Sequence, residues 1–110
     1  MTILYLVTRS PFRSSRVRTA LSLIEIHLQN QQPVGLILLN DSVIACVKGS
    51  SFETQLTNLN AMGLKLFVSA TDLKARGIKD SKVFEYCELM TYETLVDQIM
   101  DETNKVVSWT

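Results

Sequence analysis

The chain has 110 residues and a formal net charge of zero, with 46% apolar and 20% charged residues. This composition indicates one soluble globular domain over residues 1–110, and it excludes a disordered tail, a second domain and an apolar run of about 20 residues that could span a membrane. The charge is unevenly distributed, because residues 1–50 hold five basic and two acidic side chains whereas residues 83–110 hold one lysine and six acids.

The first strand and helix are predicted near the N-terminus. Residues 3–7 form a continuous apolar run, as in a strand covered on both faces, and Ser10 and Pro11 mark a turn. Residues 14–29 then show helical spacing, and Ser14 or Ser15 is suited to cap the helix. The apolar stripe consists of Val17, Ala20, Leu21, Ile24 and Leu28. Apolar residues precede basic ones, which is the reverse of a secretory signal, so we expect a cytoplasmic protein.

The middle of the chain continues this alternation. A second buried strand is predicted at residues 34–39, followed by turn residues at 40–42. Residues 43–48 fit a short helical turn that Gly49 closes. A weaker helix over 51–62 ends at Gly63.

The last part of the chain adds three strands and two helices. The strands are predicted at 64–69, 83–87 and 106–109; a short helix begins at Thr71 and Asp72 and ends at Gly77, and an amphipathic helix covers 92–101. Alternating strands and helices predict an α/β fold, a three-layer α/β/α sandwich around a mainly parallel sheet of about five strands. Ligands of such sheets collect beyond the carboxyl ends of the strands, which makes residues 8–13, 40–46 and 70–72 the candidate site.

Several familiar chemistries do not fit these segments. The turn after the first strand lacks glycine and no P-loop motif occurs, which argues against nucleotide binding. A receiver domain needs carboxylates where this chain has Thr8 and Arg9. The one histidine, His27, lies beside the apolar stripe without a motif partner, so we expect a structural or surface role. We expect neither a metal nor a cofactor.

The two cysteines are far apart in sequence and are expected to be reduced thiols. Cys46 follows the second strand on the ligand edge, where a helix start could favour a thiolate. Its apolar neighbours favour inert packing instead, and both interpretations stay open. Cys87 stands between Glu85 and Glu88, whose charges would raise its thiol pKa, and packing is favoured there too.

Two surfaces are candidates for binding. The stretch TRSPFRSSRVR, residues 8–18, holds four arginines, whose partners could be solvent, an acidic protein surface, or phosphate and nucleic acid. Sparse aromatic residues and a neutral total charge disfavour an autonomous nucleic-acid binder. Leu23 and Ile26 extend the apolar surface of the first helix beyond its stripe, which predicts burial by another chain unless the domain itself covers them.

The stretches TRSPF, LILLNDSVIACVKG, KLFVSATDLKARGI and VVSW resemble the TusB/DsrH family of small sulfur-relay proteins, in the right order over nearly the whole chain. The resemblance implies a DsrEFH-like sandwich and assembly with TusC/DsrF-like and TusD/DsrE-like siblings into a heterohexamer. In TusB-type systems that complex passes persulfide sulfur toward 2-thiolation of the tRNA wobble uridine. In DsrH-type systems it serves cytoplasmic sulfur oxidation. A TusE/DsrC-like protein is the implied sulfur acceptor.

The resemblance also bears on individual residues. The reactive cysteine belongs chiefly to the TusD/DsrE-like sibling, and Phe67 stands at about that position here. Ala20 stands roughly where some DsrH-type members have a cysteine, Cys46 where relatives have alanine, and Asp41 and Ser42 replace an acidic-glycine turn.

These differences imply a non-catalytic, structural subunit. Its binding or interface residues are expected to be Arg9, Arg13, Leu23, Ile26, Asp41, Arg76 and Trp109. Arg9 matches a basic position of the family's turn, and the arginines would contact a sibling or an anionic substrate such as tRNA. Two alternatives remain: a sulfurtransferase that carries persulfide on Cys46, and an independent anion-binding regulatory module.

Overall fold

The computed structural model describes residues 2–109, except for the side chain of Trp109. Five strands form one sheet in the order β4-β3-β2-β1-β5, and every neighbouring pair is parallel. The strands are β1 (Thr2–Val7), β2 (Val34–Leu38), β3 (Lys65–Ser69), β4 (Glu88–Met90) and β5 (Asn104–Trp109). The predicted α/β class and the parallel sheet are therefore confirmed.

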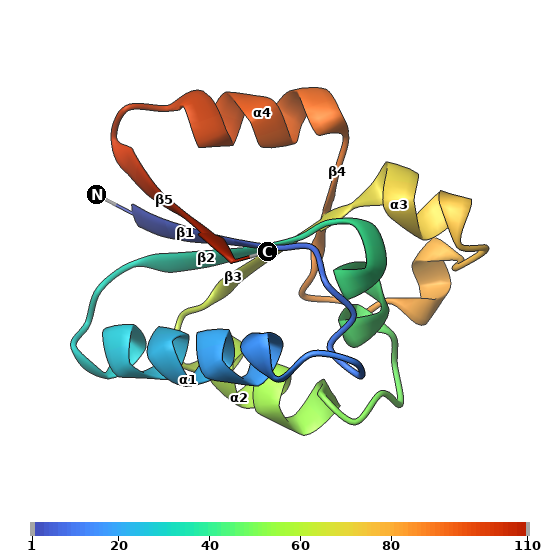
Figure 1. Cartoon of the computed structure of the whole chain (residues 1–110), viewed down its shortest axis with the longest axis horizontal. Helices are drawn as coiled ribbons and strands as arrows, with labels where there is room; N and C mark the ends of the chain where they lie inside the picture. Colours follow the sequence, from blue (N-terminus) through green and yellow to red (C-terminus); the bar gives the residue numbers. More distant parts are fainter. Residues whose placement is uncertain (1, 110) are drawn as a thin grey trace.

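Helices cover both faces of this sheet, which gives the three layers of the predicted sandwich (Figure 1). The α-helices are α1 (Ser15–Gln29), α2 (Glu53–Ala61), α3 (Ala70–Ala75) and α4 (Tyr92–Met100), and the 3₁₀ helices are η1 (Asn40–Cys46) and η2 (Asp80–Lys82). Helices α1 and α2 lie on one face and α4 lies on the other (Figure 1). None of the helices among the described residues is long and apolar enough to cross a membrane.

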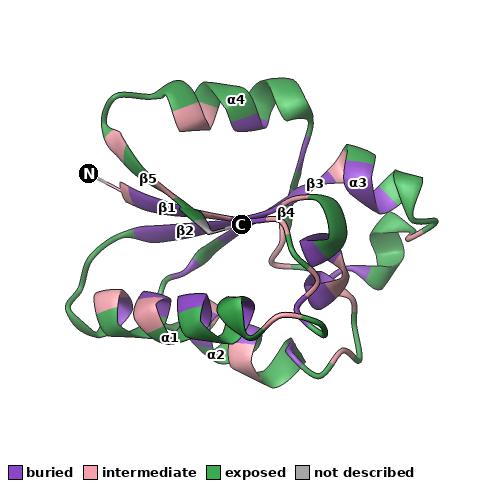
Figure 2. Cartoon of the chain, viewed as in Figure 1, coloured by how far each residue is buried: buried purple, intermediate pink, exposed green. Residues whose placement is uncertain are grey.

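The core is divided by the sheet into a large and a small cluster. Successive strand residues face opposite sides, so Tyr5 belongs to the cluster under α1 and α2 whereas Leu4 belongs to the cluster under α4. The α4 cluster has five buried members: Leu4, Ile37, Phe67, Met90 and Leu95. Figure 2 shows the buried residues on the strands and on the helix faces that look toward them.

Helix α1 forms as its sequence predicts. The Ser14 hydroxyl caps its start by accepting a hydrogen bond from the Arg16 N–H at 3.2 Å. All five residues of the predicted apolar stripe are buried. His27 lies near its end, with Nε2 3.0 Å from the Tyr5 hydroxyl oxygen, which gives this ring a structural partner on β1.

The prediction of the fourth strand is wrong. Residues 83–87 contain the buried side chains of Val83 and Phe84, but they pack against the end of η1 and not along β3. Val83 forms an isolated antiparallel bridge with Val47, and the Phe84 N–H donates to the Cys46 carbonyl oxygen at 3.0 Å. The strand that pairs with β3 is Glu88–Met90. An apolar run in a sequence predicts that the residues are buried, but it does not show that they form a strand. Here the buried residues Val83 and Phe84 belong to a loop.

Other boundaries differ by smaller amounts. Strand β5 begins at Asn104, two residues earlier than predicted, and the predicted turn at 40–42 is already the first turn of η1. Gly49, Gly63 and Gly77 all have positive φ, which fits their predicted places after helical segments.

Candidate functional site

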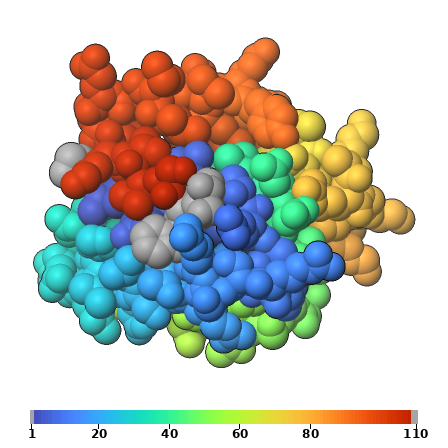
Figure 3. Space-filling model, in the orientation of Figure 1, coloured from blue at the N-terminus to red at the C-terminus, as the bar shows by residue number. Residues whose placement is uncertain are grey.

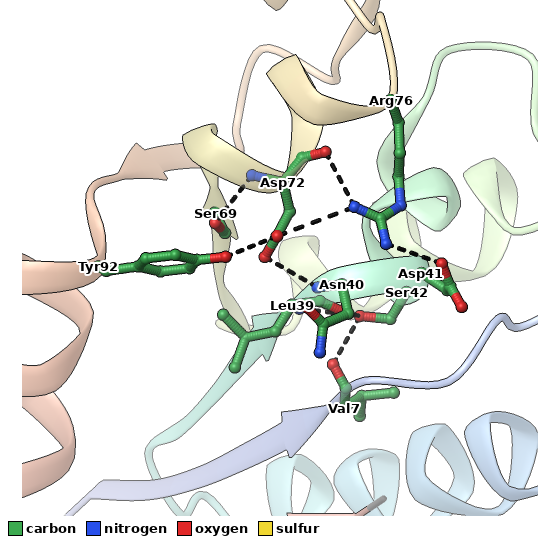
Figure 4. Close-up of polar contacts among 9 residues, drawn as sticks. All are labelled: Val7, Leu39, Asn40, Asp41, Ser42, Ser69, Asp72, Arg76 and Tyr92. Carbon is green, nitrogen blue, oxygen red and sulfur yellow. Dashed lines mark hydrogen bonds and ion pairs between the residues drawn. The ribbon is translucent and has the colours of Figure 1, made fainter.

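Polar side chains gather where β2, β3 and β4 end, which is the edge that a parallel sheet offers to ligands. Each of these strands is followed at once by a helix: η1 after β2, α3 after β3 and α4 after β4. Ser42, Asp72 and Tyr92 lie in these three helices and Arg76 is the residue that ends α3; the side chains of Asp72, Arg76 and Tyr92 point toward one another, whereas that of Ser42 points toward Val7 (Figure 4). We call Ser42, Asp72, Arg76 and Tyr92, together with Asp41, the edge cluster.

Asp72 lies at the centre of the edge cluster and is only 6% exposed. Its backbone N–H donates to the hydroxyl of Ser69, the residue that caps α3, at 3.2 Å. Its Oδ1 accepts a 2.6 Å hydrogen bond from the Tyr92 hydroxyl, and its Oδ2 accepts a 2.9 Å bond from the Asn40 N–H. Asn40 presents that N–H with a positive φ of 53°, a conformation that asparagine tolerates. One carboxylate thus joins the ends of three strands.

Arg76 connects this carboxylate to the surface. Its Nη1 donates to the Asp72 carbonyl oxygen at 3.2 Å and lies 3.8 Å from Asp72 Oδ1. Its Nη2 donates to Asp41 Oδ1 at 2.8 Å. The Asp41 side chain is 66% exposed, so solvent screens this second ion pair and its contribution to stability is small. The structure therefore brings together Asp41 and Arg76, two of the residues singled out in the sequence.

Two groups of the edge cluster, Asp72 and Tyr92, have shifted pKa values. Burial by itself would raise the pKa of Asp72, but hydrogen bonds from Tyr92, Asn40 and Ser69 and the charge of Arg76 outweigh it and lower the pKa. The hydrogen bond to the Asp72 carboxylate raises the pKa of Tyr92, and burial adds to this effect. Asp72 is therefore an acceptor and Tyr92 a donor, which suits a structural connection better than proton transfer at neutral pH.

Ser42 fixes the start of η1 against β1. The side chain is fully buried, and its hydroxyl oxygen lies 2.6 Å from the Val7 carbonyl oxygen and 2.7 Å from that of Leu39. The same oxygen accepts a 2.9 Å hydrogen bond from the Leu39 N–H. Hydrogen bonds thus attach the segment after β2 to two neighbouring elements. Ser42 attaches it to β1, and Asp72 attaches it to α3.

Two hollows flank the edge cluster. One, of about 260 Å³, is lined by Ser10, Arg13, Asp41 and Ile44, and so places the predicted Arg13 beside the predicted Asp41. The other, of about 270 Å³, runs between the cluster and α4. It is lined mostly by apolar side chains: Leu39, Asn40, Asp72, Tyr92, Leu95, Val96 and Ile99. The arrangement offers an arginine on one side and an apolar slot on the other.

The thiols line neither of these two hollows. Cys46 ends η1 and is fully buried, and its thiol donates to the Val43 carbonyl oxygen at 2.9 Å. Cys87 is half-buried and directly precedes β4, so it lies at the amino end of that strand. The pKa of Cys87 is raised, mainly by interaction with the Cys46 thiol and secondly by burial. Neither sulfur is part of the edge cluster.

The remaining predicted residues are spread over the surface. Arg9 is exposed in the loop after β1, and residues 8–18 lie in blue on the face that Figure 3 presents, where they border the green of η1. On α1, Leu23 is half-buried against the core, whereas Ile26 is 52% exposed. The backbone of Trp109 is in register with Val7 at the end of β5, and its side chain lies outside the described part of the chain.

Sequence reasoning missed the roles of the two residues at the centre of the edge cluster. Asp72 falls within residues 70–72 of the predicted ligand edge, but the sequence predicts no role for it beyond the start of a helix, and Tyr92 is predicted only as a helix boundary. A local signal for Asp72 did exist, because Ser69 and Asp72 have the serine-x-x-acid spacing of a helix cap. Tyr92 had no such signal, since its partner lies 20 residues away.

Comparisons with known proteins agree with this architecture. A family model described as "DsrH like protein" matches residues 9–105. No curated protein matches the sequence. Among solved structures, the ychN protein from E. coli is similar with a TM-score of 0.85 and 21% identity, over 98% of each chain. Protein MTH1491 from Methanobacterium thermoautotrophicum matches with a TM-score of 0.78 and 13% identity, over 97% of this chain and 96% of its own. Protein BT1422 from Bacteroides thetaiotaomicron matches with a TM-score of 0.80 and 11% identity, over 97% of this chain and 93% of its own.

Proposed function

This chain belongs to the DsrH-like family of sulfur-relay proteins, and from that premise we propose that it is a non-catalytic subunit that completes a complex around the reactive thiol of a sibling. Its siblings would be a TusC/DsrF-like and a TusD/DsrE-like chain, joined with it in a cytoplasmic heterohexamer. The complex would serve either 2-thiolation of the tRNA wobble uridine or sulfur oxidation, with a TusE/DsrC-like protein as sulfur acceptor.

The observation that carries this proposal is the placement of the two thiols. A persulfide carrier needs a thiolate that its donor can reach. The Cys46 side chain is 0% exposed, and the raised pKa of Cys87 keeps that thiol protonated at neutral pH. Phe67, at about the position of the sibling's reactive cysteine, is buried in the cluster under α4. These features favour a supporting role over direct sulfur transfer.

The basic loop and the edge cluster supply the proposed contact surface. Arg9 and Arg13 are exposed and form no ion pair within the described residues. Arg13 and Asp41 line the same hollow, so a partner that enters it would meet both charges. Arginine recognises carboxylate and phosphate equally well, which suits an acidic sibling surface or tRNA bound at the shared site. Ile26 supplies a separate apolar contact on α1, beside the half-buried Leu23.

The test is reconstitution with candidate siblings, a TusC/DsrF-like and a TusD/DsrE-like chain. Each protein is purified alone and mixed, and light scattering after size exclusion measures the assembly. The complex is then incubated with a cysteine desulfurase and cysteine, and mass spectrometry locates the persulfide. We expect an assembly that requires this chain, with persulfide on the sibling. A variant with both Cys46→Ser and Cys87→Ser should support sulfur transfer at the same rate.

Three outcomes would contradict the proposal. Persulfide on Cys46, lost together with transfer in Cys46→Ser, would favour the sulfurtransferase alternative. A stable homo-oligomer that does not bind either sibling would favour an independent anion-binding module. Unchanged sulfur transfer by the siblings in the absence of this chain would remove the supporting role.

A further inference from the structure

The two cysteines, 41 positions apart in the sequence, are brought together by the loop that precedes β4. The Phe84 N–H donates to the Cys46 carbonyl oxygen at 3.0 Å, and the Cys87 N–H donates to the Phe84 carbonyl oxygen, also at 3.0 Å. One residue beyond the end of η1, Val47 forms an antiparallel bridge with Val83. Cys87 therefore packs against the core cluster that contains Cys46.

The side chains follow the backbone. The ionisation of nearby groups agrees with this placement: both thiols raise the pKa of the Tyr86 phenol, and interaction with Cys46 raises the pKa of Cys87. Cys46 is fully buried whereas Cys87 is half-buried, so Cys46 lies on the inner side of this contact region and Cys87 on the outer side.

Only the outer thiol faces a space that a small molecule can enter. Cys87 lines a hollow of about 370 Å³, together with Lys48, Asp80, Ser81, Val83, Phe84, Glu85 and Leu89. Cys46 is fully buried and does not line this hollow. A reagent in the hollow therefore meets the sulfur of Cys87 first, and Cys46 approaches that sulfur from the protein interior.

We propose that Cys46 and Cys87 are a dithiol that closes to an intramolecular disulfide when a low-molecular-weight disulfide oxidises it. In the first step Cys87 loses its proton and its sulfur attacks one sulfur of the reagent RSSR. The reagent's S–S bond breaks, and one RSH leaves through the hollow. In the second step Cys46 loses its proton and attacks the Cys87 sulfur, which releases the second RSH. Two electrons pass from the protein thiols to the reagent, and the end of η1 becomes tethered to the loop before β4.

The contact between the thiols also determines how this reaction depends on pH. The thiolate is the attacking species in thiol–disulfide exchange. The raised pKa of Cys87 makes that thiolate scarce at pH 7, so the reduced pair is the resting state and closure accelerates as pH rises.

The experiment uses the full-length chain, reduced, freed of reductant and incubated with oxidised glutathione at pH 8.5. The reaction is quenched with acid, unfolded and treated with N-ethylmaleimide. The expected product is a monomer that has lost two hydrogen atoms and takes up no maleimide. Trypsin should then release a linked pair of peptides, residues 19–48 and 83–105, which separate on reduction.

Single-cysteine variants define the order of attack. Cys46→Ser should stop at a mixed disulfide on Cys87, at a level at least about tenfold above that in the wild type, because the second exchange is intramolecular. Cys87→Ser should keep Cys46 unmodified while the chain is folded. The proposal is overturned if the wild type accumulates the mixed disulfide, forms only intermolecular bonds or still takes up two maleimides.

Discussion

Asp72→Asn is the most informative single change, because it keeps the shape of the side chain while it removes the charge at the centre of the edge cluster. The carboxylate accepts from the Asn40 N–H through one oxygen and from the Tyr92 hydroxyl through the other. An asparagine amide has one oxygen and one NH₂ group, so one of these two donors loses its acceptor. The residue is 6% exposed, so water cannot readily replace the lost partner.

The expected loss at pH 7 is about 2 kcal/mol of unfolding free energy, the value of one buried hydrogen bond to a charged group. For a domain of this size that loss corresponds to about 8 °C in Tm. Tyr92→Phe removes one bond whose donor is 46% exposed, and its expected cost is about 1 kcal/mol. In the double variant the two losses should not add, because they share one interaction.

The pH dependence gives a second, independent signature. The pKa of Asp72 is lowered in the folded state from its usual value of 3.8, so between the two pKa values the unfolded chain binds more protons. The stabilisation from this charge is thus complete above pH 3.8 and is lost as pH falls through the folded-state pKa. The difference in unfolding free energy between the wild type and Asp72→Asn should accordingly become smaller as the pH falls below 3.8.

Urea unfolding from pH 2.5 to 7, followed by circular dichroism, measures both effects. Asp97→Asn is the matched control: it removes a carboxylate from an exposed position on α4 and should change stability by less than about 0.5 kcal/mol. Two results would refute the role given to this carboxylate. One is that Asp72→Asn is as stable as the wild type at pH 7, and the other is that their difference in unfolding free energy stays constant down to the lowest pH.

Three further predictions concern other parts of the molecule. Gly35→Ala should cost about 2 kcal/mol in urea unfolding, because its Cβ would lie 2.7 Å from the Leu4 Cδ2 atom in the small core cluster; an unchanged midpoint would contradict this. Alkylation of Cys87 by iodoacetamide should be slow at pH 7 and still rise above pH 9, since its pKa is raised; a rate that levels off by pH 8 would contradict this. Replacing both Arg9 and Arg13 by alanine should leave Tm within about 2 °C but weaken sibling or tRNA binding, with a smaller salt dependence of affinity in calorimetry. Equal affinities of variant and wild type at low and high salt would remove the proposed contact.

The repeating parts of the fold could be predicted from the sequence because their signals are local. The stripe of α1 contains its own period and its own cap at Ser14, and all of its predicted core residues are buried. Strands β1 and β2 read as apolar runs, and β3 as a short apolar run between Lys65 and Ser69, because helices cover both faces of a parallel sheet. The sheet rule then placed residues 40–46 and 70–72 at one edge, where Asp41 and Asp72 indeed both lie near Arg76.

The pairing within the edge cluster could not be predicted, because it depends on contacts between distant positions. Asp72 meets Asn40 across 32 residues and Tyr92 across 20. Nothing in the local pattern distinguishes Tyr92 from an ordinary first residue of an amphipathic helix. Tyr92 reaches Asp72 because β4 ends beside β3, so that the start of α4 faces the start of α3.

The misplaced fourth strand had the largest consequence for the chemistry. If residues 83–87 had paired with β3, Cys87 would have been the last residue of a strand and would have faced the carboxyl edge with the other candidate groups. Glu88–Met90 takes that place, with two exposed residues and one buried, a pattern too short and too polar to identify as a strand. The apolar residues before it fold back onto η1 instead. Because of this one difference, Cys87 lies in the core region that contains Cys46 and not at the carboxyl edge of the sheet.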